Sequence, residues 1–285
     1  MHASVPRPSA LLALACSALL AACTSTPAAS SQATTPAPII ANAQLDAAIA
    51  GSWRDPKNTA RDVYRHPRET LAFFGVQPDH TVIEISPGGG WYTEILAPYL
   101  HASGNYVAAM PAAPVDSGGG RRNAALQAKL AADAARYGKA EYREFDGKAP
   151  DFGAAGSADA VLTFRNVHNW VADDSAAAYF RAFFAVLKPG GTLGVVDHRA
   201  KPGTALDAMK KSGYLTEALV IDLATRAGFT LVASSQVNAN PKDDADHPNG
   251  VWTLPPSNRH DAADKAAYQG IGERDRMTLR FRKPA

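Results

Sequence analysis

The chain has 285 residues, a mass of 30.0 kDa and nearly balanced charge, with 29 basic and 27 acidic residues. This length can bury a sizeable core in one large α/β domain or two small ones. A net charge of +2 gives no electrostatic reason to expect nucleic acid as a partner, and 46% hydrophobic residues exclude a chain that is disordered throughout. Both cysteines, Cys16 and Cys23, lie near the N-terminus, which excludes a disulfide framework and a cysteine-based metal site from the rest.

The first 23 residues have the pattern of an export signal. Arg7 precedes an apolar run at residues 10–20, which has about the length of a signal-peptide core and is too short to cross a bilayer. The run ends in Leu-Ala-Ala-Cys at residues 20–23, which resembles the lipobox of bacterial lipoproteins. That resemblance implies cleavage before Cys23 and attachment of a diacylglycerol to its thiol. The alternative is an ordinary cleaved signal with an incidental cysteine.

Residues 24–43 carry no charge and are rich in Ala, Ser, Thr and Pro. Such a segment cannot bury enough apolar surface to fold, so it is predicted to be a flexible tether. Together with the anchor at Cys23, it predicts an exported protein held at a membrane that faces the periplasm, with the lipid as its only membrane attachment. Residues 44–285 are then the folded domain.

From residue 44 onward, the sequence alternates between strand and helix patterns, as in a parallel α/β sheet. Met277, Leu279 and Phe281 alternate with polar residues, which predicts a last strand with one wetter face. Residues 238–262 are polar and rich in Pro, Asn and Asp, which predicts a long loop or lid. Short apolar runs predict the other strands at residues 81–85, 106–109, 140–145, 160–164, 192–196 and from 231 onward.

A glycine-rich turn directly after the first predicted strand is the strongest functional indication. Residues 84–90 read Glu-Ile-Ser-Pro-Gly-Gly-Gly, and a helix pattern follows. Glycines allow a tight turn and a close approach of the backbone to a ligand, although alone they also fit a dinucleotide site. The carboxylate of Glu84 can accept from a ligand ammonium group. The segment resembles motif I of class I S-adenosylmethionine-dependent methyltransferases, Asp/Glu-x-Gly-x-Gly-x-Gly, with Ser86 at the first glycine position, followed by Gly88 and Gly90.

Two later segments extend this resemblance. Residues 163–167, Thr-Phe-Arg-Asn-Val, look like the segment after the fourth strand of the ubiquinone/menaquinone C-methyltransferase group. Residues 187–191, Leu-Lys-Pro-Gly-Gly, look like the end of the helix before strand five in these enzymes. The resemblance implies a Rossmann-like class I methyltransferase fold: a mostly parallel seven-stranded sheet with the last strand antiparallel and helices on both faces.

The resemblance further implies S-adenosylmethionine as the cofactor and methyl transfer to a small-molecule acceptor. One position departs from the family pattern. An acid usually ends the second strand and accepts from the ribose hydroxyls, but here that position is Met110, and Asp116 follows six residues later as a substitute. Loss of such an acceptor weakens binding by about 1.5–3 kcal/mol. The residues that the resemblance gives to the cofactor are Glu84, Ser86, Gly88, Gly90, Asp146, Gly147, Arg165 and Asn166, with Asp146 accepting from the adenine amino group.

Methyl transfer from a sulfonium needs a base only when the nucleophile must lose a proton early. His168 and His198, after strands four and five, are the candidates for that role. A metal shared by His66, His168 and His198 matches no local ligand spacing, so no metal is expected. Two other functions stay open. One is a non-catalytic binding protein on the same fold, favoured by Met110 and the export signal. The other is a nicotinamide-dependent enzyme, against which Glu84 and the Lys-Pro-Gly-Gly segment argue.

Overall fold

The computed structural model describes residues 1–4 and 42–285. Residues 5–23 of the predicted signal, with Cys16 and Cys23, and residues 24–41 of the predicted tether lie outside the described residues. The first helix, α1 (Ala43–Ile49), begins at the last residue of that predicted tether, and the side chain of Asn42 caps it by accepting from the Leu45 N–H at 3.0 Å. No helix within the described residues has both the length and the apolar character that a membrane span requires.

Seven strands form a single sheet in the order β3-β2-β1-β4-β5-β7-β6. The first five strands pair in parallel, and β7 runs antiparallel to both of its neighbours. The predicted Rossmann-like fold, with its antiparallel last strand, is therefore confirmed. The strands are β1 (Thr81–Ile85), β2 (Asn105–Pro111), β3 (Glu141–Phe145), β4 (Ala158–Phe164), β5 (Leu187–His198), β6 (Thr230–Ser235) and β7 (Arg276–Arg282).

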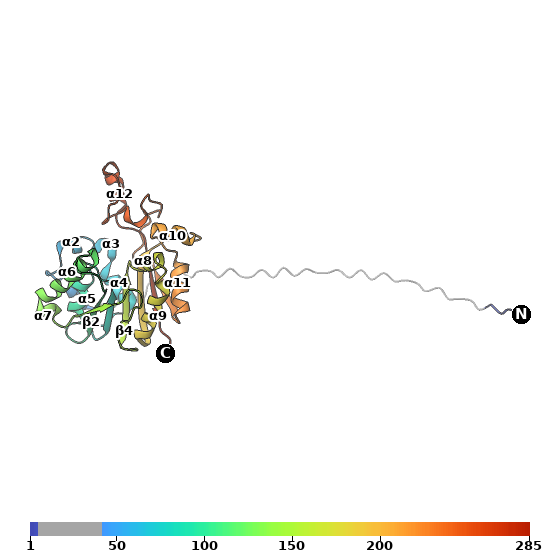
Figure 1. Cartoon of the computed structure of the whole chain (residues 1–285), viewed down its shortest axis with the longest axis horizontal. Coiled ribbons are helices and arrows are strands. Elements are labelled where there is room, and N and C mark those ends of the chain that lie inside the picture. The colour runs from blue at the N-terminus through green and yellow to red at the C-terminus, as the bar shows by residue number, and fades with distance from the viewer. Residues whose placement is uncertain (5–41) are drawn as a thin grey trace. The chain divides into compact units, whose positions relative to one another are not determined.

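Helices cover both faces of the sheet, and each face has its own apolar core. One core is formed with α1, α4 (Pro67–Phe74), α5 (Thr93–Leu100), α6 (Gly118–Ala132) and α7 (Ala134–Tyr137). The other is formed with α8 (Val167–Ala172), α9 (Ala176–Val186), α10 (Leu206–Ser212) and α11 (Glu217–Arg226). The remaining short elements are α2 (Pro56–Thr59), α3 (Asp62–Arg65), η1 (Gly250–Trp252), η2 (Ala262–Asp264) and α12 (Lys265–Ile271), which stands away from the sheet in Figure 1.

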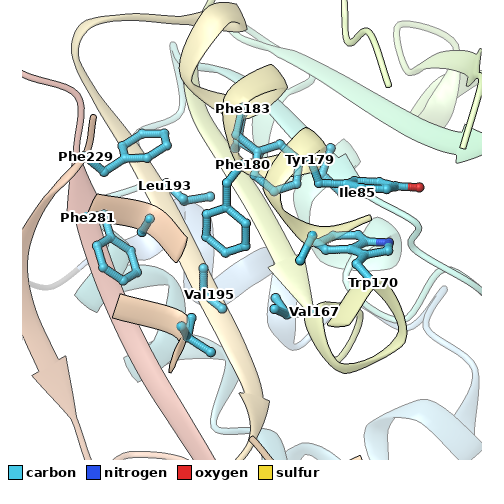
Figure 2. Close-up of a cluster of buried hydrophobic side chains, with 14 of the residues drawn as sticks. Ile85, Val167, Trp170, Tyr179, Phe180, Phe183, Leu193, Val195, Phe229 and Phe281 are labelled. Carbon is cyan, nitrogen blue, oxygen red and sulfur yellow. The ribbon is translucent and has the colours of Figure 1, made fainter. Parts of the chain in front are cut away.

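The second core fixes the strands that end at the functional edge. Figure 2 shows Phe180 from α9 lying against Leu193 and Val195 of β5, and all three side chains are fully buried. Trp170 of α8 stacks on Tyr179 of α9 with ring centroids 4.1 Å apart. Truncating a buried phenylalanine of this kind costs about 3–5 kcal/mol, because a cavity is left behind. The loops that follow β4 and β5 are therefore held by a rigid base.

The structure differs from the sequence predictions in three places. The Ala-rich pattern of residues 123–137 predicts one helix, but the structure has two, α6 and α7, which begin at Gly118 and are separated at Asp133. Residues 187–191, expected at the end of the helix before strand five, directly follow the end of α9 but already belong to β5. The wetter face predicted for the last strand is buried at Thr278, because Asn238 donates to the hydroxyls of both Thr70, on α4, and Thr278 at 3.0 Å. The same face becomes more exposed along the strand, since Arg280 is half-buried and Arg282 is exposed.

Candidate active site

A cavity of about 280 Å³ opens at the carboxyl edge of the sheet, where β1, β4 and β5 end. The chain leaves β1 toward β2 on one side, whereas β4 lies on the other side of β1, so this is the point where the strand order reverses. Ligands of doubly wound sheets bind in the crevice that this reversal creates. The loop after β6 closes the cavity with Val251, Trp252 and Ser257.

The glycine-rich turn forms one wall of this cavity. Ser86, Gly88 and Gly90 have positive φ angles of 50°, 62° and 80°, a conformation that glycine adopts without strain. A Cβ atom placed on Gly88 or Gly89 would have no heavy atom within 4 Å, so the backbone there is open to a ligand. Gly90 differs, because a Cβ there would lie 3.2 Å from Leu126. Gly90 is therefore required for packing of α6 and does not line the cavity.

Glu84 lies at the base of the cavity and is 2% exposed. The Tyr106 hydroxyl donates to its Oε2 atom at 2.6 Å, and the Tyr106 and Thr93 hydroxyls are 2.7 Å apart. Burial raises the pKa of Glu84 to about 7, although the Tyr106 hydrogen bond and the charge of Arg65 act in the opposite direction. The carboxyl group is therefore poised to become ionised when a cationic ligand group approaches it.

Four arginines also line the cavity: Arg61, Arg65, Arg165 and Arg274. Behind them, Glu273 accepts from Arg61 Nε at 2.5 Å, lies 3.6 Å from Arg65 Nε and pairs with Arg276. Burial opposes ionisation of Glu273, but the charges of Arg276, Arg65 and Arg61 outweigh it and lower its pKa to about 2. Arg274 holds the loop after β6 in place, since its Nη1 and Nη2 atoms donate to Pro255 O at 2.6 Å and Ser257 Oγ at 3.0 Å.

His168 and His198 come together on the cavity wall, with ring centroids 5.0 Å apart. Asp197 lies beneath them and is fully buried. Its Oδ1 atom is 2.8 Å from His168 Nδ1, and it also accepts from the backbone N–H groups of both histidines, at 3.2 Å and 2.7 Å. A carboxylate can only accept, so it places the proton of a neutral His168 on Nδ1 and leaves Nε2 as an acceptor.

His198 has the opposite character. Its Nδ1 atom is buried without a hydrogen-bond partner in the described part of the chain. Burial, followed by the proximity of His168 and three arginines, holds the pKa of His198 well below its usual range, so the ring is neutral at physiological pH.

Ligand atoms of His168, Asp197 and His198 lie within 4.8 Å of one another, which is close enough for a metal site. The same arginines oppose a divalent cation, and Asp197 already accepts from His168. His66, the third histidine considered for a metal from the sequence, is not in this group.

The sequence-predicted cofactor residues divide into two sets. Glu84, Ser86, Gly88, Arg165 and Asn166 line the cavity. Asn166 also joins the two central strands, since its Nδ2 atom donates to Ile85 O at 2.8 Å and to Thr163 Oγ1 at 3.2 Å.

The others lie outside the cavity. Asp146 is exposed and accepts from the Lys148 N–H at 2.8 Å, and neither it nor Gly147 is among the cavity residues. Met110, at the end of β2, is 4% exposed in the apolar core, and Asp116 is exposed outside the cavity.

Sequence reasoning missed Arg61, Arg274 and the Val251–Trp252 wall. Arg61 and its partner Glu273 are 212 residues apart in the chain, so no local pattern connects them. The composition of residues 238–262 predicts a long loop or lid. Composition does not indicate which side chains of such a loop reach the site.

Comparisons with solved structures agree with this architecture. A methyltransferase from Aquifex aeolicus that depends on S-adenosylmethionine is 13% identical, with a TM-score of 0.54 over 80% of this chain and 94% of that chain. A candidate sarcosine dimethylglycine methyltransferase from Galdieria sulphuraria is 14% identical, with a TM-score of 0.52 over 81% and 91% of the two chains. The [4+2]-cyclase SpnF is also 14% identical, with a TM-score of 0.52 over 82% and 83%.

No family model matches the sequence, and no curated protein matches it. At these identities the structural likeness establishes the fold, which is the class I methyltransferase fold, and leaves the chemistry to be argued from the site. SpnF has a similar fold but is named as a [4+2]-cyclase, so similar folds do not imply the same reaction.

Proposed function

We propose that the chain binds S-adenosylmethionine at the turn of residues 86–90 and transfers its methyl group to a small-molecule acceptor. The observation that carries this proposal is the open backbone at Gly88 and Gly89, at the point where the strand order of a methyltransferase-type sheet reverses. Side chains fill the space beside many other glycines of the chain, but none enters the space beside these two.

The residues around the turn fit the amino-acid half of this cofactor. Glu84 is a carboxyl group close to its ionisation point and can accept from an ammonium group. Ser86 and Gly88 offer backbone at close range. The adenosine half has less support, because Met110 replaces the acid that would accept from the ribose. Asp146, at the end of β3, is left as the acceptor for the adenine amino group.

The chain's own groups can then perform three tasks. When bound, S-adenosylmethionine supplies a methyl group activated on a sulfonium. His168 Nε2 accepts the proton that the acceptor loses, and the buried Asp197 stabilises the imidazolium that results. Trp91, Phe164 and Trp252 line the cavity and exclude water from the reacting atoms. Positioning and water exclusion are most of what such a displacement requires from a protein.

Isothermal titration of the purified full-length chain tests this proposal. Saturable binding of S-adenosylmethionine and of S-adenosylhomocysteine is expected, with no binding of a nicotinamide dinucleotide. Mass spectrometry of any ligand that copurifies gives an independent answer. The absence of heat and of a thermal shift at millimolar S-adenosylmethionine contradicts the proposal.

A second candidate function is ligand binding without methyl transfer. Met110 favours it, because a site that lacks the ribose acceptor holds an adenosyl cofactor more weakly, by about 1.5–3 kcal/mol. Methylation of any small-molecule acceptor with labelled S-adenosylmethionine, lost in a cavity variant that still folds, excludes this second function.

We also propose that the chain is exported and lipidated at Cys23. The support is the Leu-Ala-Ala-Cys sequence after an apolar run. Incorporation of a labelled fatty acid in a bacterial host is expected for the parent chain and for Cys16→Ser, and is expected to be lost in Cys23→Ser. Equal labelling of both variants contradicts attachment at Cys23.

A further inference from the structure

Arg165 projects a charge into the cavity without any partner in the described part of the chain. No carboxylate of residues 42–285 lies within ion-pair distance of its guanidinium, and no side-chain hydrogen bond engages it, although it lines the cavity. Burial, then the nearby charge of Arg276, lowers the pKa of Arg165 to about 10, which leaves it cationic at physiological pH. Arg165 is half-buried, and a partly desolvated cation without a partner favours a ligand that supplies the missing anion.

Arg65, which also lines the cavity, has donors that lack a hydrogen-bond acceptor, although its Nε atom lies 3.6 Å from Glu273 Oε2. It is 4% exposed, and its Nε and Nη2 atoms are buried without a hydrogen-bond acceptor. Its guanidinium lies over the Trp91 ring, 4.7 Å from the centroid, so the stack fixes the guanidinium plane, and the edge with Nε and Nη2 is left without a hydrogen-bond acceptor. A planar edge of free donors matches a carboxylate or a phosphate, which accept two parallel hydrogen bonds.

The charges of the cavity do not balance. Among the described residues that line it, four are arginines and one, Glu84, is a carboxylate. Glu273, just behind the wall, is already shared among Arg61, Arg65 and Arg276. Asp197 is engaged by His168. The excess of positive charge is therefore left for a ligand to neutralise.

The cofactor alone does not neutralise it. S-adenosylmethionine carries one carboxylate but also an ammonium and a sulfonium, so its overall charge is positive. Its binding would add to the excess. We infer that Arg65 and Arg165 bind the oxyanion of a second ligand, and that the methyl acceptor is a small carboxylic acid or phosphate ester. This identification of the acceptor rests on the proposed methyl transfer, whereas the anion site itself does not.

Binding of simple oxyanions to the full-length chain tests the site. Inorganic phosphate and citrate are titrated by thermal shift and calorimetry, with sodium chloride at matched ionic strength as the reference, in the presence and absence of S-adenosylhomocysteine. The expected result is stabilisation by the oxyanions in both cases. Arg165→Gln is expected to lower the affinity for the oxyanions by about ten-fold or more, because a charged bidentate contact is lost. For Arg165→Lys we expect an oxyanion affinity between those of the parent chain and Arg165→Gln, because lysine keeps the charge but cannot donate two parallel hydrogen bonds.

Two controls separate this site from a general charge effect and from a folding defect. Arg226→Gln removes an exposed arginine of α11 that pairs with Asp222, and it should leave oxyanion binding unchanged. Arg165→Gln without ligand should be at least as stable as the parent chain, because a half-buried charge without a partner is gone.

The cofactor's own carboxylate is the other possible occupant of these arginines. If it is, the oxyanions compete with S-adenosylhomocysteine, and Arg165→Gln weakens S-adenosylhomocysteine but not methylthioadenosine, which lacks the amino-acid part. That pattern overturns the inference, as does an absence of oxyanion binding. If oxyanions bind but S-adenosylmethionine does not, the proposed methyl transfer fails while the anion site stands.

Discussion

The carboxyl edge of the sheet has two unlike halves. At β1, β4 and β5 the chain encloses a cavity with a buried carboxyl, two histidines and four arginines. At β2 and β3 the corresponding positions are Met110, which lies within β2 and is buried in the core, and Asp146, which is exposed in a turn after β3. The fold is the same across both halves, but the polar chemistry is concentrated in one.

The fold alone therefore does not show which ligand the site takes, because the polar residues that bind a ligand differ between the two halves. A site specialised for the adenosyl group would have carboxylates at the β2–β3 half, where ribose and adenine are read. Here most of the polar side chains lie in the other half, at β1, β4 and β5, and under the proposed function their excess of positive charge favours an acidic acceptor. The following changes test whether the two halves work as one site.

The largest effect is expected from Gly88→Arg. The new side chain has open space on the cavity side of the turn, so it would fill the cavity and abolish S-adenosylmethionine binding, with a loss of more than about a hundred-fold. Calorimetry measures the affinity and circular dichroism checks the fold. Gly203→Arg is the matched control, because Gly203 also has a positive φ (81°, against 62° for Gly88), open space and an exposed position away from the cavity. Each change costs about 1–2 kcal/mol of backbone strain. Equal binding by both variants places the ligand elsewhere.

His168→Gln is expected to lower kcat by about 10²–10⁴ and to leave S-adenosylhomocysteine affinity unchanged, because a positioned base is lost while the turn is intact. Asp197→Asn should shift the pH–rate profile, since the tautomer of His168 is no longer fixed. His101→Gln, at the end of α5 and outside the cavity, serves as the control. A kcat that does not change in His168→Gln means that the acceptor needs no base.

Glu84 should make stability depend on pH. Its pKa rises from 4.5 to about 7 on burial, so between these values the folded protein holds a proton that the unfolded chain releases. Its contribution is therefore fully present below about pH 4.5 and is lost as pH rises to about 7, by about 3 kcal/mol. The lowered pKa of His198 acts in the opposite sense, since its contribution is lost as pH falls.

The difference between the parent and Glu84→Gln isolates the Glu84 term in urea denaturation at a series of pH values. Glu84→Gln should flatten the profile, and Glu144→Gln, at an exposed carboxylate of β3, should not. Parallel profiles for the parent and Glu84→Gln contradict the raised pKa.

The sequence predicts the parts of the site that are local in the chain, and it does not predict the parts that only the folded chain brings together. The strand, the acid and the glycine turn are contiguous, so the position of Glu84 and Gly88 at the candidate site could be predicted from local pattern alone. His168 and His198 could be placed at one edge, because parallel strands end together. Asp197 as the partner of His168, 29 residues away, needed the actual register of β4 and β5. The arginine cluster joins α3, the loop after β4 and the segment before β7, and no spacing rule connects those.

Asp146→Asn has the smallest expected effect and tests the weaker half. The asparagine keeps the acceptor for the Lys148 N–H and removes only the charge, so stability should stay within about 0.5 kcal/mol. If Asp146 accepts from the adenine amino group, S-adenosylhomocysteine affinity falls by about three- to ten-fold, since a charged hydrogen bond is replaced by a neutral one. Asp151→Asn is a close match, because Asp151 forms the same kind of turn by accepting from the Gly153 N–H at 2.9 Å, outside the cavity. An affinity that is equal in the parent and both variants would leave β3 without a role in binding, and the ligand would then be held by the β1, β4 and β5 half alone.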